Sequence, residues 1–341
     1  MLASRSLGRS SNDFTTICPS SPPSIKCNQG AKIKTSLSGK FKNVDGIDWL
    51  SDEIRPELII DGTAYSLGMY LPATVKTEQT ETETIVSVDA YDRCWNVRDN
   101  YTETLVYFAA GTNYLAPVKE LLTLAGISFV IETPTAATLA EDREDWDVGT
   151  SYLTIINQLL TEINYHELWF DADGAAVLEP VSTPTAENIE HMLDSSNIKS
   201  LLLPRITQTT DLYSAPNSFI VICSNADKSG GMVAKSENIN PQSPLSINRR
   251  GRKITSVVKV NNIASQSELQ EYADKLRNMS LITGETIEVT TALFPGYGVN
   301  DVTGISYGDL FAVCLERKWE MRLDVGGEMR HTLERVVIAL G

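Results

Sequence analysis

Residues 150–180 constrain the fold more than any other stretch, because the pattern changes within them from helical to strand-like spacing. Thr150 or Ser151 can cap a helix N-terminus, since a side-chain oxygen there accepts an otherwise unpaired backbone N–H. Apolar residues then recur at helical spacing and predict one buried face, formed by Leu153, Ile155, Ile156, Leu159, Leu160 and Ile163.

A β-hairpin is predicted directly after this helix. Strand-forming residues at 168–170 precede the turn sequence Ala172-Asp173-Gly174, and a second apolar run at 176–178 ends at Pro180. Helix and hairpin each need an apolar partner surface, and the segment contains no group of catalytic side chains. We interpret it as a packing and assembly element.

Most of the remaining chain carries short, strand-like patterns. An alternating stretch at 31–39, strands around an Asp61-Gly62 turn and an alternating stretch at 85–91 predict a small barrel or sandwich over residues 25–110. Residues 196–341 are β-rich again, with strands expected at 218–224, 254–260, 285–292, 310–315, 319–323 and 333–340. An inserted helix is predicted over residues 267–279 of this part.

Between the two β-rich parts, residues 111–195 predict a smaller α+β domain. Pro117 to Ala125 is a short helix that stops at Gly126, a strand follows at 127–131, and residues 134–147 form an acidic loop. Residues 1–24 are rich in Ser, Pro and Asn and predict a flexible N-terminal arm. The expected fold class is β-rich α+β, with two β-domains flanking a smaller α+β domain.

Charge and cysteine usage exclude several function classes. The formal net charge of −15 argues against a surface that grips nucleic acid or docks on an anionic membrane. The five cysteines form no CxxC pair, so buried reduced thiols are favoured over a disulfide framework, although Cys18 and Cys27 could pair in principle. No apolar run approaches the roughly 20 residues that a membrane-spanning helix needs.

The candidate catalytic and metal motifs are weak. Gly304-Ile-Ser306-Tyr-Gly308 fits the nucleophile-elbow pattern, but a strand follows where a helix is required, and Asp324 and His331 are too close in sequence to complete a hydrolase site. The three histidines, at 166, 191 and 331, show no zinc-ligand spacing. Asp171 to Gly174 resembles only the start of a calcium loop, and a hairpin turn explains it. The expectation is no catalytic, cofactor or metal site.

Arg249, Arg250, Arg252 and Lys253 form the one basic run of the chain. Three interpretations stay open: a solvated turn before the strand at 254, an ionic contact with an acidic protein, and a nucleic-acid contact. The solvated turn is favoured, and the overall acidity places a protein contact ahead of nucleic acid. These four residues are the predicted protein-interface residues.

Several stretches, in their order along the chain, resemble the baseplate hub (tail hub) proteins of bacteriophage tails and related contractile injection systems. They are Asp48-Trp-Leu-Ser-Asp-Glu-Ile-Arg-Pro56 with Asp61-Gly62 and Leu67-Gly68, Val88-Asp-Ala-Tyr-Asp-Arg-Cys-Trp-Asn96, the helix–hairpin around Leu168-Trp-Phe-Asp171, Asp211-Leu-Tyr-Ser-Ala-Pro-Asn217, Pro241-Gln-Ser-Pro-Leu-Ser246 with Arg249-Arg-Gly-Arg252, and Gly326-Gly-Glu-Met-Arg-His331. Together they cover about residues 31–335. The arm with Cys18 and Cys27 departs from the pattern of this family.

The resemblance implies two β-barrel-like tube domains, at 25–110 and 196–341, and a homotrimeric ring of pseudo-sixfold symmetry in the virion tail. Such a ring joins the tail tube protein to a spike or tip protein, contacts distal tail or baseplate proteins, and passes DNA only as cargo. The family implies a structural protein without enzymatic activity. An acidic lumen would let DNA slide without sticking.

Two other functions compete with this one. A carbohydrate- or receptor-binding β-module of the tail tip would need an exposed aromatic platform, and Trp146 is the one tryptophan with acidic rather than apolar neighbours in sequence. A hydrolase would use Ser306 or an acidic pair, and a Ser306→Ala variant would then lose activity.

Overall fold

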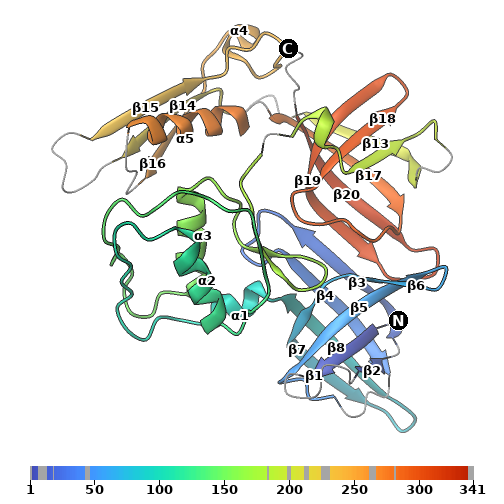
Figure 1. Ribbon diagram of the computed structural model, residues 1–341. Coiled ribbons are helices and arrows are strands. Elements are labelled where there is room, and N and C mark those ends of the chain that lie inside the picture. Colours follow the sequence, from blue (N-terminus) through green and yellow to red (C-terminus); the bar gives the residue numbers. More distant parts are fainter. Residues whose placement is uncertain are drawn as a thin grey trace. The chain divides into compact units, whose positions relative to one another are not determined.

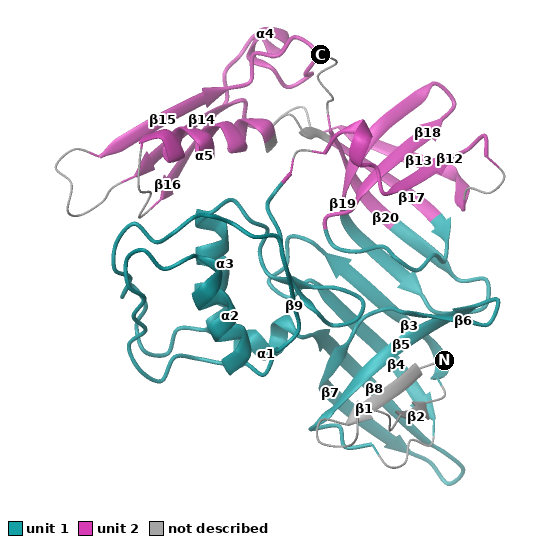
Figure 2. Cartoon of the chain, in the orientation of Figure 1, with its two compact units in different colours: residues 1–181, 291–299, 317–330 teal, residues 182–290, 300–316, 331–341 magenta. Residues whose placement is uncertain are grey.

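The computed structural model describes residues 2–6, 14–17, 19–42, 47–182, 184–197, 201–210, 215–223, 231–260, 266–279 and 282–336. The chain divides into two compact units, shown in Figure 2. Unit 1 comprises residues 1–181, 291–299 and 317–330, and unit 2 comprises residues 182–290, 300–316 and 331–341. Strands β19 (Leu310–Arg322) and β20 (Glu328–Val336) contribute residues to both units.

Unit 1 contains an antiparallel sheet in which the strands follow the order β19-β3-β4-β8-β7-β5-β1-β2, with β6 paired to β5 (Figure 1). Its strands are β1 (Leu2–Ser6), β2 (Phe14–Ile17), β3 (Pro19–Asn28), β4 (Thr35–Lys42), β5 (Asp52–Ile60), β6 (Thr63–Ser66), β7 (Tyr70–Gln79) and β8 (Thr84–Asp92).

Alternation of apolar and polar residues explains why these strands pack on one face. In β8, Val86, Val88 and Ala90 are buried, while the intervening side chains are more exposed. They join Ile25, Leu37, Phe41, Ile54 and Tyr70 in one apolar cluster. The Asp61-Gly62 turn is confirmed: Ile60 pairs with Thr63, and both turn residues have positive φ, 49° and 81°.

The segment predicted as an N-terminal arm, residues 1–24, contains β1, β2 and the first part of β3. Cys18 lies outside the described residues, so its pairing with Cys27 stays a prediction. Cys27 itself is buried in the apolar cluster of unit 1.

The helix–hairpin segment is confirmed and forms a second apolar core in unit 1. Helix α3 (Tyr152–Glu162) buries the predicted face, and its neighbours are α1 (Cys94–Asp99) and α2 (Leu115–Leu124). The hairpin consists of β10 (Trp169–Phe170) and β11 (Ala176–Leu178), to which β9 (Val130–Glu132) adds in parallel. Leu153, Leu160, Leu168 and Leu178 are all at most 2% exposed in this core.

One detail of the helix prediction is wrong. Ser151 occupies the N-cap of α3, but its hydroxyl accepts no backbone N–H of the helix. It donates instead to the carbonyl oxygen of Arg98 at 2.7 Å. The Ser151 hydroxyl therefore makes a tertiary hydrogen bond to the end of α1 and does not cap α3.

Polar contacts attach the hairpin turn to β5, β6 and the start of α1 within unit 1. Ser66 Oγ donates to the carbonyl of Ala172 at 2.6 Å, and Arg93 donates to the carbonyl of Gly174 at 2.9 Å. The same Arg93 guanidinium holds Glu53 in a bidentate pair at 2.8 and 2.9 Å, and both side chains are largely buried.

Unit 2 contains a sheet path β13-β17-β20-β19, extended from β19 through β18 to β12. The elements are η1 (Ala186–Asn188), β12 (His191–Asp194), β13 (Leu202–Thr210), β17 (Ile282–Ala292), β18 (Val302–Tyr307) and the adjoining parts of β19 and β20. β18 is antiparallel to β19, whereas the short β12 runs parallel to β18. Ile287, Ile305, Cys314 and Leu333 are fully buried in the core of this sheet.

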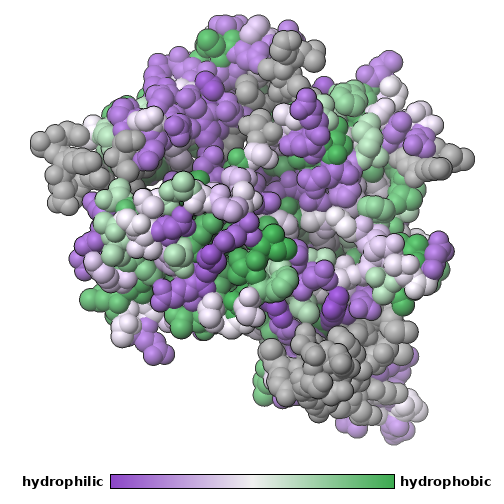
Figure 3. Space-filling model, in the orientation of Figure 1, coloured by the Kyte–Doolittle hydropathy of each residue, from purple (hydrophilic) through white to green (hydrophobic). Residues whose placement is uncertain are grey.

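A separate three-stranded sheet in unit 2 has the order β15-β14-β16 and packs against helix α5. The elements are β14 (Ser218–Cys223), β15 (Met232–Glu237), α4 (Ile247–Arg250), β16 (Thr255–Val260) and α5 (Gln266–Met279). Leu269 and Ala273 of α5 are fully buried against Val221 and Cys223. The outward surface over α5 is largely hydrophilic (Figure 3), as expected for an amphipathic helix.

These elements confirm a β-rich α+β chain with few helices. The strands expected at 310–315 and 319–323 form one continuous strand, β19. The turn expected at 225–231 lies, except for Gly231, outside the described residues, as do residues 211–214 and 337–341. No helix in the described parts of the chain has the length and apolar character that a membrane crossing requires.

Candidate functional site

The predicted interface residues lie on α4 and the turn after it. Ser246 caps α4 by accepting the backbone N–H of Arg249 at 3.3 Å, and Gly251 ends it in the left-handed conformation at φ 65°. The helix is one turn long, and Arg249 and Arg250 lie in it.

Two of these cations make identified local contacts. Arg250 donates to the carbonyl of Ala215 at 2.7 Å, and Lys253 forms an ion pair with Glu237, which also pairs with Lys235 at 2.9 Å. The two lysines lower the pKa of Glu237 to about 2. Arg249 and Arg252 are exposed on the same segment. The role of the four residues in an interface stays a prediction.

The weak catalytic and metal motifs have structural explanations. Ser306 lies inside β18, where it is aligned with Asp194 and Phe311, and is not exposed on an elbow between a strand and a helix. Asp171 Oδ1 accepts the backbone N–H groups of Asp173 and Ala175 at 3.0 and 2.8 Å, so this aspartate closes the hairpin turn.

The expectation of an exposed Trp146 is wrong. This side chain is only 4% exposed, and its indole N–H donates to Gln158 Oε1 at 3.0 Å. Arg143 lies over the ring at 5.0 Å and pairs with Asp145 and Glu162, which draws the acidic loop inward. Trp146 is therefore not available for a sugar-binding platform.

A group of titratable side chains that are distant in sequence gathers at one end of the unit 2 core. In β12 and β18, His191 is aligned with Thr303 and Leu193 with Ile305. Side chains two residues apart on a strand share a face. His191 and Thr303 therefore lie on the same face as the core residues Leu193 and Ile305, next to them along the strands. By the same rule, Glu316 lies on the same face as the core residue Cys314 in β19. His331 likewise lies on the same face as the core residue Leu333 in β20.

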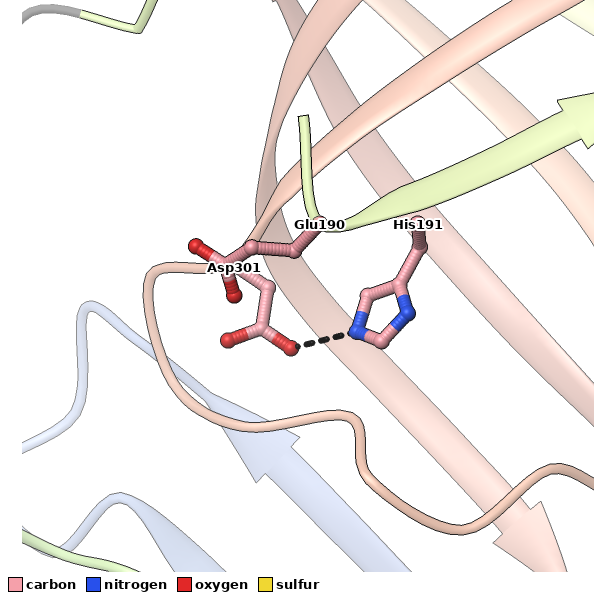
Figure 4. A group of neighbouring side chains, drawn as sticks. All are labelled: Glu190, His191 and Asp301. Atoms are coloured by element: carbon pink, nitrogen blue, oxygen red, sulfur yellow. Dashed lines mark hydrogen bonds and ion pairs between the residues drawn. The ribbon is translucent and has the colours of Figure 1, made fainter. Parts of the chain in front are cut away.

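Two close contacts join members of this group. His191 Nε2 lies 3.0 Å from Asp301 Oδ2, and their side chains are 15% and 10% exposed. His331 Nδ1 lies 2.9 Å from Glu316 Oε2, with both side chains essentially inaccessible. Glu190 is exposed and directly precedes β12, and its carboxylate lies beside that of Asp301 (Figure 4).

Burial shifts the pKa values of the inner pair, Glu316 and His331, in opposite directions. It raises the pKa of Glu316 well above its usual value, and the nearby charge of Asp301 adds to this effect. It lowers the pKa of His331 to about 3, and the charge of His191 acts in the same direction. Both shifts disfavour the charged forms of the two groups, whose facing atoms lie within hydrogen-bond distance.

Three residues in or next to this cluster carry buried side-chain oxygen atoms without a hydrogen-bond partner in the described parts of the chain. Asn300 Oδ1, Thr303 Oγ1 and Glu316 Oε1 have no hydrogen-bond partner among the described residues. Buried polar atoms in folded proteins are nearly always paired with protein, water or an ion. The cluster therefore has capacity to hold a further polar group.

Sequence spacing missed this cluster because its members come from four strands. His191 and Asp301 are 110 residues apart, and His331 and Glu316 are 15 apart. The one local signal is that His191 and His331 each stand two places from an apolar core residue of the same strand, Leu193 and Leu333.

No family model matches the sequence, and a search of curated protein sequences finds no match either. Solved structures do match. The 43 kDa tail protein of prophage MuSo2 from Shewanella oneidensis is similar with a TM-score of 0.71 and 12% identity, over 98% of each chain. A tail protein from Neisseria meningitidis gives 0.68 at 12% identity, over 98% of this chain and 95% of the other.

A third match extends the fold beyond phages. A component of the type VI secretion system of E. coli, described as structurally similar to the T4 tail proteins gp27 and gp5, gives a TM-score of 0.57 at 12% identity, over 99% of this chain and 77% of the other. These likenesses agree with the resemblance to tail proteins that the sequence shows. The chain has the fold shared by phage tail proteins and their secretion-system counterparts.

Proposed function

We propose that this chain is a structural protein of a phage tail baseplate. The observation that carries the proposal is the likeness to the MuSo2 tail protein, which covers 98% of both chains and leaves almost no part unmatched. A fold shared over its full length supports a shared architectural role more strongly than a shared domain would, although fold alone does not determine function.

In finer detail, we infer a tail hub, in which three copies form a ring of pseudo-sixfold symmetry between the tail tube and a spike or tip. Its two tube domains would be residues 25–110 and 196–341, with 111–195 as the inserted domain and 1–24 as the arm. The support is that each unit has its own strand-rich core, built from Ile25 and its neighbours in unit 1 and Ile305 and its neighbours in unit 2.

Protein contacts in such a ring would use Arg249, Arg250, Arg252 and Lys253. A chain with 44 acidic and 29 basic residues presents many carboxylates to its copies, and a compact basic segment is complementary to them. The expected partners are other copies, the tail tube protein, the spike or tip protein and neighbouring baseplate proteins, with DNA passing through as cargo. The proposal includes no membrane contact, cofactor or catalytic step.

Size-exclusion chromatography with light scattering tests the trimer. The expected result is a mass of three chains, or a monomer that assembles when tail tube protein is added, and averaged electron micrographs should show three subunits around an axial hole. An Arg249→Glu/Arg252→Glu variant should assemble less well, while Lys32→Glu, an exposed cation in unit 1, should assemble like the unchanged protein. A strict monomer over a wide concentration range, also with tube protein, would contradict the proposal.

A further inference from the structure

We propose that Glu190, His191 and Asp301 bind a divalent metal ion of the zinc class, with the buried carboxyl group of Glu316 beside it. This site is independent of the role in a tail, because it is built within unit 2 from the residue before β12, the first residue of β12 and the residue before β18.

Two of the three side chains already have the spacing of ligands on a single ion, and the third lies near them. One ligand atom from each lies within 4.8 Å of the other two, and His191 Nε2 is 3.0 Å from Asp301 Oδ2. Two donors bound to one ion at about 2.1 Å are separated by about 3.0 to 3.4 Å for octahedral or tetrahedral angles. Figure 4 shows the carboxylates of Glu190 and Asp301 side by side, with the imidazole of His191 directed at Asp301.

The buried carboxyl group of Glu316 provides a second, independent observation. Glu316 is 1% exposed, and its Oε1 has no hydrogen-bond partner among the described residues. The backbone N–H of Glu316 donates to the carbonyl of Asp301 at 2.9 Å, so this residue adjoins the ligands. Thr303, aligned with His191, likewise has a buried hydroxyl without a partner among the described residues.

The donor set selects the kind of ion. Ca²⁺ and Mg²⁺ prefer all-oxygen sites, whereas an imidazole nitrogen with carboxylates suits Zn²⁺ and neighbouring transition metals. Two carboxylates and a neutral imidazole also neutralise the charge of a divalent ion. Zn²⁺ is therefore the probe of choice.

Bound metal would have a structural consequence. β12 has four residues and pairs with β18 alone among the described strands, so few backbone bonds hold it. An ion bound by His191 and Asp301 would cross-link the start of β12 to the chain that enters β18. We expect the metal to raise the unfolding temperature of the full-length protein.

The test uses the full chain after removal of metal with a chelator. Titration calorimetry with Zn²⁺ should give one site per chain, and Co²⁺ should produce a visible absorption band that reports nitrogen and oxygen ligands. His191→Gln should weaken Zn²⁺ binding by at least about 100-fold, since loss of supporting outer contacts alone costs about 10- to 100-fold. Glu190→Gln should weaken it by about 10-fold or more.

Glu187→Gln is the matched control, because it removes the same charge from an exposed position three residues away, on η1. It should leave Zn²⁺ affinity and the Co²⁺ band unchanged. Glu190 is also exposed, so the Glu190→Gln variant should fold. It tests the metal site even if His191→Gln does not fold. The proposal is overturned if the unchanged protein binds no Zn²⁺, or if Glu190→Gln and Glu187→Gln bind it equally.

Discussion

At the scale of single residues, buried charged groups connect segments that the sequence keeps apart. Asp92, only 3% exposed, accepts the backbone N–H of Thr35 at 2.6 Å, its hydroxyl at 3.1 Å and the backbone N–H of Cys94 at 2.9 Å. It ties the start of β4 to the first turn of α1. Burial raises its pKa, while these three hydrogen bonds act in the opposite direction.

Replacing Asp92 with alanine should destabilise unit 1 by about 2 to 4 kcal/mol, because the buried backbone N–H of Cys94 and the partly buried N–H of Thr35 lose their acceptor. All five tryptophans lie in unit 1, so urea unfolding followed by tryptophan fluorescence reports on this unit. Asp89→Ala is the control. Asp89 sits on the same strand and accepts from Ser38 at 2.8 Å, but at an exposed position, and should cost less than about 1 kcal/mol. Equal losses in both variants would contradict the assignment.

Glu237 provides a prediction with a pH window. Lys253 and Lys235 lower its pKa from 4.5 to about 2, so the pairing contributes fully above about pH 4.5 and is lost as the pH falls toward 2. The contribution should be below about 1 kcal/mol, since the pair is solvent-accessible. In a Lys253→Met variant, the pKa of Glu237 measured by NMR titration should move back toward 4.5. Lys259→Met, on the same sheet, should leave it in place.

At the scale of elements, the hairpin β10–β11 depends on the fit of its turn against β5, β6 and the residue before β7. Gly174 has φ 79°, and a Cβ built there would lie 2.5 Å from Met69 Sδ. Its carbonyl also accepts from Arg93, so the position combines a left-handed backbone with close packing.

A Gly174→Ala variant should therefore lose about 1 to 3 kcal/mol of unit 1 stability in the fluorescence-detected unfolding experiment. The Gly62→Ala variant separates the cost of the left-handed backbone from the cost of the close contact with Met69. Gly62 has nearly the same φ, 81°, but nothing lies within 4 Å of its added Cβ. The loss in Gly62→Ala measures backbone strain alone, and Gly174→Ala should exceed it. A smaller loss at Gly174 would show that Met69 and Arg93 move aside without cost.

At the scale of the whole molecule, charge opposes the proposed assembly. Three copies would carry three times −15, about −45, and their mutual repulsion has to be offset by packing at the interfaces. Salt screens this repulsion, with a Debye length of about 10 Å at 0.1 M.

The trimer should consequently become more stable as NaCl rises from about 0.05 to 0.5 M, because screening shortens the range of the repulsion. Sedimentation at several salt concentrations measures the association constant. If association weakens with salt instead, then specific ion pairs, such as those expected of Arg249 and Arg252, dominate over the net charge. The Arg249→Glu/Arg252→Glu variant would then lose the salt dependence.

What the sequence determined by itself was local. Periodicity predicted α3 with its buried face, the hairpin β10–β11, the Asp61-Gly62 turn, α5 and most strands, because spacings of 3.6 and 2.0 are set by the geometry of a single element. The apolar sequence neighbours of Trp49, Trp95, Trp169 and Trp319 also favoured buried positions for these four side chains.

Only the tertiary structure decided which distant residues meet. It buried Trp146 under Arg143, turned Ser151 toward Arg98, and placed His191, Asp301, Glu316 and His331 in one group. The pairing of β12 with β18 brings His191 to Asp301 across 110 residues of sequence, a distance over which local spacing carries no information. The physical reason is that side-chain periodicity fixes the face on which a residue lies, while the register between strands decides what it faces.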